Sequence, residues 1–114
     1  MLDLLLLTYL KIKPIQYRLT RVTAYCAGRC CCGDFADGYT ANGTSVEGTK
    51  KFVAAPKTYR FGTMVYIEGY SDNDVPVLDR GGSIRGARLD VYFESHEEAL
   101  EWGVKYIIVL VMKE

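Results

Sequence analysis

The feature that most constrains the fold of this chain is a series of short segments in which apolar and polar residues alternate. Residues 17–25 alternate in this way and are rich in β-branched and aromatic side chains, and residues 88–93 repeat the pattern. Alternation with a period of two is typical of a strand with one buried and one exposed face. Residues 64–67 and 75–78 are shorter strand-like runs bounded by turn residues. The chain of 114 residues fits one small domain built mainly of strands.

The end of the chain adds a further strand and a helix. Residues 106–112 are all apolar, which predicts a strand buried on both faces. Ser95 and Glu98 form a capping box, because the Ser95 hydroxyl can bond the Glu98 backbone N–H while the Glu98 side chain reaches back to Ser95. Gly103 is suited to end this helix after about two turns. Many short strands with one small helix predict a closed or nearly closed β-barrel.

A long loop rich in glycine and cysteine is expected over residues 26–49. It contains all the cysteines of the chain, Cys26, Cys30, Cys31 and Cys32. Three consecutive cysteines cannot easily point at one tetrahedral metal, so we expect no metal and no cofactor. A disulfide from Cys26 to Cys31 or Cys32 would pin the loop, and reduced thiols are the main alternative.

Charge and the N-terminal region exclude several classes of protein. Lys+Arg and Asp+Glu number 14 each, and this zero net charge argues against a non-specific nucleic-acid binder. The apolar run Leu4–Leu10 is far shorter than the roughly 20 residues that span a bilayer. It follows the acidic Asp3, so it does not resemble a secretion signal. We expect residues 1–19 to form an N-terminal arm or an extra strand, and residues 20–114 to form the domain.

Two aspartates joined by a glycine-rich turn are the strongest candidates for chemistry. Asp79 ends one predicted strand and Asp90 lies within the next. The connecting glycines leave a floor without side chains on which a ligand can lie, and they are Gly81, Gly82 and Gly86. Arg85 and Arg88 offer donors to ligand oxygens. If the aspartates face each other, repulsion raises one pKa and makes that carboxyl a general acid. In the alternative, structural interpretation, Asp79 caps the turn and Asp90 pairs with Arg88.

The region around these aspartates resembles the signature of the three-aspartate (3D) domain. This domain is related to the C-terminal part of the membrane-bound lytic transglycosylase A group. Residues 79–93 fit that signature almost throughout. Residues 95–103 match the family's next helix with the sequence Ser-His-Glu-Glu-Ala-Leu-Glu-Trp-Gly, and residues 62–67 match a strand with Gly-Thr-Met-Val-Tyr-Ile. Further upstream, residues 39–43 also match the family. Residues 25–26 and 31–33 resemble a subgroup of the family that carries cysteines, so the resemblance covers about residues 20–112.

The resemblance implies a double-psi β-barrel and a peptidoglycan substrate. Lytic transglycosylases cut the MurNAc–GlcNAc bond without water and close a 1,6-anhydro ring, using one carboxyl as acid and then as base. By family position, Asp90 is the general acid/base and Asp79 its supporting carboxylate. Thr40 and Arg85 are expected to bind the sugar above the floor of Gly81 and Gly82. His96 is expected to have a capping or surface role.

One departure from the family leaves other functions open. The family has a third aspartate before a proline, and Ala55 stands in its place before Pro56, while Arg60 replaces another usual proline. A non-catalytic glycan-binding barrel is therefore one alternative. A structural or docking component of a phage virion is another, with residues 1–19 contacting a neighbouring virion subunit. In each case we expect a protein that acts at the bacterial cell wall, outside the cytoplasm.

Overall fold

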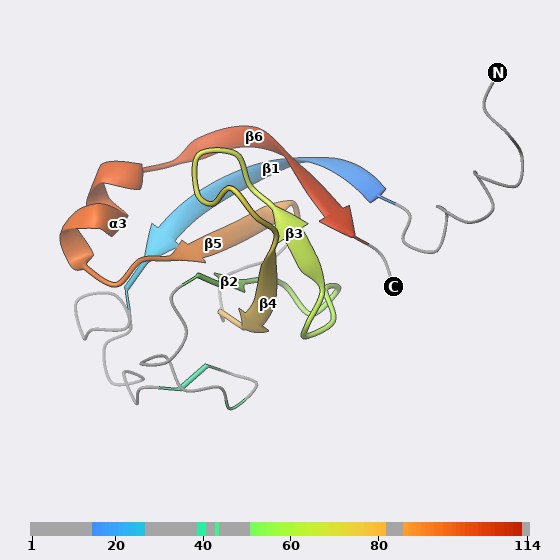
Figure 1. The fold of residues 1–114 in the computed structure, drawn as a ribbon, viewed down its shortest axis with the longest axis horizontal. Helices are drawn as coiled ribbons and strands as arrows, with labels where there is room; N and C mark the ends of the chain where they lie inside the picture. Colours follow the sequence, from blue (N-terminus) through green and yellow to red (C-terminus); the bar gives the residue numbers. More distant parts are fainter. Residues whose placement is uncertain (1–14, 27–38, 41–42, 44–50, 82–85, 113–114) are drawn as a thin grey trace, which may run out of the picture.

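The computed structural model describes residues 15–26, 39–40, 43, 51–81 and 86–112, and these form a closed β-barrel with one short helix (Figure 1). In chain order the elements are β1 (Ile15–Tyr25), β2 (Val53–Ala54), β3 (Met64–Tyr66), β4 (Val75–Asp79), β5 (Arg88–Tyr92), α3 (His96–Trp102) and β6 (Lys105–Met112). The strands expected over residues 17–25, 64–67, 75–78, 88–93 and 106–112 are present as β1, β3, β4, β5 and β6. Within the described residues, no helix is long and apolar enough to cross a membrane.

The strand order around the barrel is β1-β5-β2-β4-β3-β6. The pairs β1–β5 and β2–β4 are parallel, and the other neighbouring pairs are antiparallel. Parallel pairing requires a long crossover connection, so strands distant in the sequence become neighbours. The expected small double-psi β-barrel with one short helix is confirmed, whereas most of the loop expected over residues 26–49 lies outside the described residues.

The barrel interior is filled by small and β-branched side chains from alternate positions of the strands. Val22, Val77, Leu89 and Val109 are fully buried there, and Trp102 of α3 closes one side of the same cluster. The Trp102 indole Nε1 donates to the Val22 carbonyl oxygen at 3.1 Å, which ties the helix to β1. Burying apolar area at roughly 25 cal/mol per Å² makes this cluster the main stabilising element of so small a domain.

The helix begins and ends where the sequence predicts. The Ser95 hydroxyl accepts from the Glu98 backbone N–H at 3.1 Å and donates to the Glu98 carboxylate at 3.0 Å. Gly103 follows the last helical residue with φ of 68°, a backbone conformation that favours glycine. The capping-box prediction is therefore confirmed, with the Glu98 side chain bonding the Ser95 hydroxyl.

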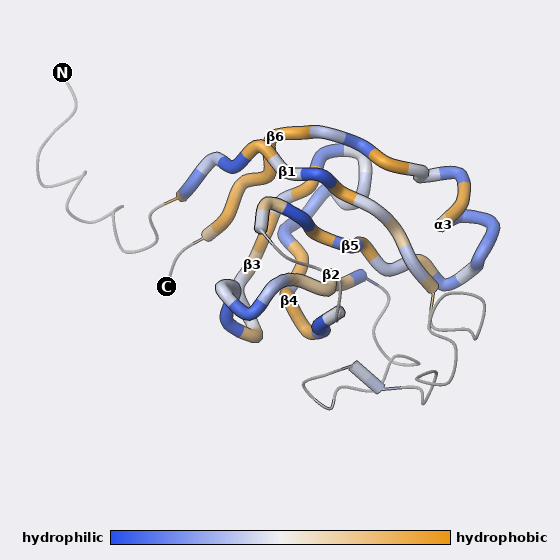
Figure 2. The backbone as a smooth tube through the Cα atoms, turned by 180° about the vertical axis from the view of Figure 1, so that it is seen from behind, coloured by the Kyte–Doolittle hydropathy of each residue, from blue (hydrophilic) through white to orange (hydrophobic). Residues whose placement is uncertain are grey.

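The prediction that residues 106–112 are buried on both faces is wrong. β6 is hydrophobic along most of its length (Figure 2), yet Tyr106 is 69% exposed and Ile108 is 52% exposed. β6 pairs with β1 along one side of the barrel (Figure 1), so only every second side chain reaches the core. The outward side chains of β1 are apolar as well, and Tyr17 and Leu19 are 72% and 64% exposed.

β1 runs across the expected boundary between residues 19 and 20. β1 begins at Ile15, and residues 15–19 pair with residues 108–112 of β6. Residues 1–14 lie outside the described residues, so the N-terminal arm stays a prediction for that segment.

Candidate active site

The barrel brings the two aspartates of the glycine-rich region to either side of β2. Ala54 is the register partner of Asp79 on β4 and also of Asp90 on β5. Neighbouring strands lie about 4.8 Å apart, so the two aspartates are separated by about two strand spacings. At this separation the charge of Asp79 still contributes to the raised pKa of Asp90. The β2–β4 register shifts at this point, and Ala54 follows the irregularity. The pairing thus brings the two carboxyls to the same part of the barrel, one on each side of β2.

Asp90 is the carboxyl whose ionisation the fold opposes. Leu89 and Val91 on either side of it are fully buried in the core, so alternation places the half-buried Asp90 on the opposite face of β5. The pKa of Asp90 is raised to about 6, chiefly because burial disfavours the charged form. A hydrogen bond from Thr23 opposes this rise in pKa, and the negative charge of Asp79 adds to it.

Asp79 is held by two donors. The Tyr25 hydroxyl donates to Asp79 Oδ2 at 2.7 Å, and the Arg80 backbone N–H donates to Oδ1 at 2.9 Å. Both bonds fix the position of the Asp79 carboxyl beside Ala54. The two carboxyls therefore sit in different surroundings, one supplied with donors and the other largely desolvated. This is the pattern expected of a supporting carboxylate beside a general acid.

Sequence reasoning missed the two β1 side chains that position this pair. Thr23 Oγ1 donates to Asp90 Oδ1 at 3.1 Å, and Tyr25 binds Asp79 as described above. The Thr23 bond follows from the parallel register of β1 and β5, in which Thr23 lies opposite Asp90. Tyr25 lies opposite Tyr92 in the same register and reaches Asp79 on β4 with its hydroxyl. The alternation of Thr23 and Tyr25 places them on one face of β1, and this was the only signal in the sequence. An ion pair between Asp90 and Arg88, one of the expected structural roles, is absent between these two described residues, since Thr23 is the partner of Asp90.

A buried aromatic cluster supports the same region. The rings of Phe52 and Tyr92 stack with centroids 4.4 Å apart, and the Tyr25 ring meets both edge-on. Phe52 is fully buried and Tyr92 is 5% exposed. These rings cannot form an open stacking platform for sugar, so their contribution is to fix Tyr25 and the neighbouring strand ends.

The other predicted site residues are only partly covered by the structure. Thr40 is 5% exposed and its carbonyl accepts from the Gly43 N–H at 2.9 Å. Gly81 is half-buried directly after Arg80. Gly82 and Arg85 lie outside the described residues, so their contact with a substrate stays a prediction. Ala55, at the position of the family's third aspartate, is fully buried in the core cluster.

Of the cysteines in this loop, only Cys26 lies within the described residues. Cys26 is 3% exposed, and its Sγ lies 3.9 Å from Nδ1 of His96 at the start of α3. Cys30, Cys31 and Cys32 lie outside the described residues. The predicted disulfide therefore stays a prediction, and His96 has an exposed position on the helix, as expected of a surface residue.

The fold and the paired carboxyls define a small closed barrel with one polar, half-buried site on its outer face. Residues 51–113 match the 3D domain family, and this chain belongs to that family. The resemblance seen in the sequence motifs is thereby confirmed.

Known relatives share the sequence over part of their length. The chain is 32% identical over 90 residues to the cell wall-binding protein YocH of Bacillus subtilis, covering 68% of this chain and 31% of YocH. It is 29% identical over 101 residues to YorM, an uncharacterized protein derived from the SPbeta prophage of the same species, covering 86% of this chain and 42% of YorM. The chain thus spans about a third to two fifths of the length of these relatives.

A solved structure shares the fold. The Streptomyces papain inhibitor matches with a TM-score of 0.56 and 21% identity, over 87% of this chain and 96% of the inhibitor. At this level of identity the match speaks for the barrel architecture alone.

Proposed function

We propose that this domain acts on bacterial cell wall peptidoglycan as a lytic transglycosylase, with Asp90 as general acid/base. The observation that carries the proposal is the half-buried Asp90, whose pKa is raised to about 6 beside the hydrogen-bonded Asp79. Membership of the 3D domain family and the similarity to a cell wall-binding protein support the choice of substrate.

In the proposed reaction Asp90 first donates a proton and then accepts a different one. Its protonated carboxyl donates the proton to the glycosidic oxygen as the bond between that oxygen and C1 of MurNAc breaks. Its carboxylate then takes the proton of the C6 hydroxyl while O6 bonds to C1, which closes the 1,6-anhydro ring and regenerates the acid. A pKa near 6 suits both halves, because acid and base forms are both populated near neutral pH.

Asp79 has a supporting role in this mechanism. Its charge helps to keep Asp90 protonated, and it is itself oriented by Tyr25 and the Arg80 backbone N–H. Thr40 and Arg85 bind sugar hydroxyls or the acetamide above the glycine floor of Gly81 and Gly82.

A glycan-binding barrel without activity is the second candidate, and Ala55 is the observation that favours it. The position of the family's third aspartate is here apolar and completely buried, so this chain has one carboxyl fewer than the family pattern. If that aspartate tunes or positions the acid, its loss leaves a barrel that holds glycan and does not cut it.

The place of action proposed in both cases is the cell wall, outside the cytoplasm. The similarity to a prophage-derived protein is consistent with a phage origin, in which a virion brings the domain to the wall and residues 1–19 contact another subunit. Purified virions probed with an antibody against this chain would contain it in that case, and their lack of it would exclude a virion component.

The decisive experiment is incubation of the pure protein with peptidoglycan sacculi, followed by mass spectrometry of the soluble products. The lytic proposal expects 1,6-anhydro muropeptides from the wild type and a loss of at least about 100-fold in Asp90→Asn. Asp79→Asn should lose less, because its role is indirect. The rate should fall as the pH rises through about 6, since the acid form of Asp90 starts the reaction.

Co-sedimentation with the same sacculi separates the two candidates. A wild type that sediments and releases no anhydro product is a binding barrel, and the lytic proposal is then wrong. A wild type that cleaves while Asp90→Asn keeps most of that activity would show that another group is the acid. A protein that neither binds nor cleaves sacculi would contradict both.

A further inference from the structure

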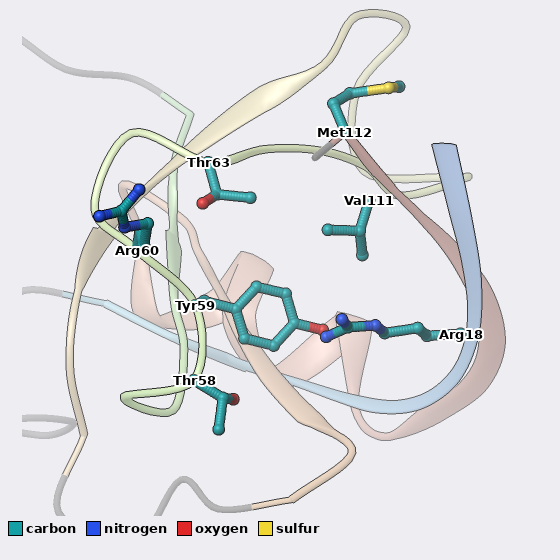
Figure 3. Close-up of a pocket in the computed structure, with 7 residues that line it drawn as sticks. All are labelled: Arg18, Thr58, Tyr59, Arg60, Thr63, Val111 and Met112. Atoms are coloured by element: carbon teal, nitrogen blue, oxygen red, sulfur yellow. The ribbon is translucent and has the colours of Figure 1, made fainter. Parts of the chain in front are cut away.

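A second candidate site is a cavity at the mouth of the barrel, where β1 begins and β6 ends (Figure 3). It has a volume of about 240 Å³. Arg18 lies five residues before Thr23 on β1, and a strand rises about 3.3 Å per residue. The cavity therefore lies on the order of 17 Å from the Asp90 side of the barrel. The mouths of β-barrels are frequent positions of ligand sites.

The polar side chains that line this cavity are basic or neutral. Its rim and walls carry two guanidinium groups and two hydroxyls, which belong to Arg18, Arg60, Thr58 and Thr63. Among the described residues that line it, none is acidic. The apolar floor is formed by the Tyr59 ring and by Val111 of β6. A cavity with positive charge and hydroxyl donors, but without a carboxylate, favours an anion carried on a small carbon skeleton.

The Arg18 side chain is ordered by contacts with Gln16 and Tyr59. Its Nε donates to Gln16 Oε1 at 3.1 Å and its Nη2 donates to the same oxygen, while its Cζ lies 5.0 Å from the centroid of the Tyr59 ring. Among the described residues its Nη1 meets no acceptor. Figure 3 shows the Arg18 guanidinium at the hydroxyl end of the Tyr59 ring, with Arg60 on the opposite side of that ring. A guanidinium already ordered by its neighbours loses little conformational freedom on binding.

The floor beneath Arg18 is rigid. Tyr59 is 4% exposed, its N–H donates to the Pro56 carbonyl at 3.0 Å, and its own carbonyl accepts from Arg80 Nη2. Arg80 directly follows Asp79, so one side chain connects the segment below the cavity with the carboxylate pair. A ligand held in this cavity would therefore be positioned relative to the proposed active site.

We propose that this cavity binds an oxyanion, a carboxylate or a phosphate, carried by a cell wall polymer. The guanidinium fork of Arg18 matches either group, and Thr58, Thr63 and Arg60 supply further donors. The anion chemistry rests on the cavity alone, and only the choice of a wall polymer rests on the proposed function. Two polymers carry the required group: peptide stems end in carboxylates, and anionic glycopolymers contain phosphodiesters.

The test is a titration of the full chain with small anionic probes at low salt, in which binding is monitored through the amide chemical shifts in NMR spectra. The probes are inorganic phosphate, poly(glycerol phosphate) and N-acetyl-D-alanyl-D-alanine. We expect saturable shifts in residues 58–63 and at Val111, and binding that weakens as salt is added. The better of the two organic probes identifies the polymer. Binding of inorganic phosphate with neither organic probe would overturn the wall-polymer assignment without affecting the cleavage test on sacculi.

Variants locate the binding and keep the proposal falsifiable. Arg18→Gln and Arg60→Gln should each weaken binding by about tenfold or more. Arg60 is exposed, so its replacement leaves the fold intact even if Arg18→Gln disturbs Tyr59. Lys57→Gln is the matched control, since Lys57 is exposed in the same segment and loses the same charge without lining the cavity. No saturable binding, or equal weakening in Lys57→Gln and Arg60→Gln, would overturn the proposal.

Discussion

Asp90→Asn should stabilise the folded protein near neutral pH while it abolishes any cleavage. The pKa of Asp90 is raised from 3.8 to about 6 in the fold. Each step of one in pKa corresponds to about 1.4 kcal/mol, so ionising this carboxyl costs about 3 kcal/mol more in the folded than in the unfolded chain. An asparagine has a similar shape, still accepts the Thr23 hydrogen bond and cannot ionise. The variant therefore avoids this cost.

The sign of the pH dependence follows from the folded pKa being the higher one. The folded state holds its proton more tightly, so the contribution of Asp90 to stability is full below about pH 4 and is lost as the pH rises through about 6. The difference between the variant and the wild type should be small at pH 4. It should grow to about 3 kcal/mol at pH 7.5.

Urea denaturation at a series of pH values measures this difference. Trp102 is the single tryptophan and is 7% exposed, so its fluorescence reports unfolding of the barrel core. Asp72→Asn is the control, because Asp72 is exposed in a turn and its replacement should change stability little at any pH. A difference between Asp90→Asn and wild type that does not change with pH, or a variant less stable at pH 7.5, would refute the reasoning.

Three further experiments test other parts of the protein. Tyr25→Phe removes the donor to Asp79 and should cost about 1–3 kcal/mol of unfolding free energy, measured by the same denaturation; an unchanged midpoint would contradict the importance of this bond. Cys26 should form an intramolecular disulfide, so intact mass should rise on reduction, and alkylation of all four thiols before reduction would count against it. Deleting residues 1–14, which include four consecutive leucines, should lower the melting temperature or change the oligomeric state, because that apolar surface is expected to be buried. A truncated protein with neither change would exclude a docked arm.

Local patterns predicted most elements of this fold, although they did not predict β2 at Val53–Ala54. The alternation of residues 17–25 and 88–93 predicts β1 and β5, and the capping box at Ser95 predicts α3, because these signals act between residues close in the sequence. Ordered motifs along the chain also identified the family, since the spacing of turns and strands is preserved in the sequence itself.

Burial depends on neighbours from elsewhere in the chain, and there the sequence was a poorer guide. The apolar run of residues 106–112 predicts two buried faces, yet Tyr106 and Ile108 are exposed because β6 packs against the core on one face only. The cavity with Arg18 is another example. Its walls come from β1, from residues 58–63 and from β6, and no local pattern brings these together.

In the candidate active site, too, local sequence patterns pointed to the residues and tertiary contacts decided their arrangement. The sequence by itself determined which carboxyls to consider, since Asp79 ends one predicted strand, Asp90 lies within the next, and a glycine-rich turn joins them. Only the tertiary structure decided that Ala54 lies between them and that Thr23 and Tyr25 bind one each. The physical reason is that parallel pairing joins strands many residues apart. The desolvation that raises the pKa of Asp90 arises only after the barrel has closed around it.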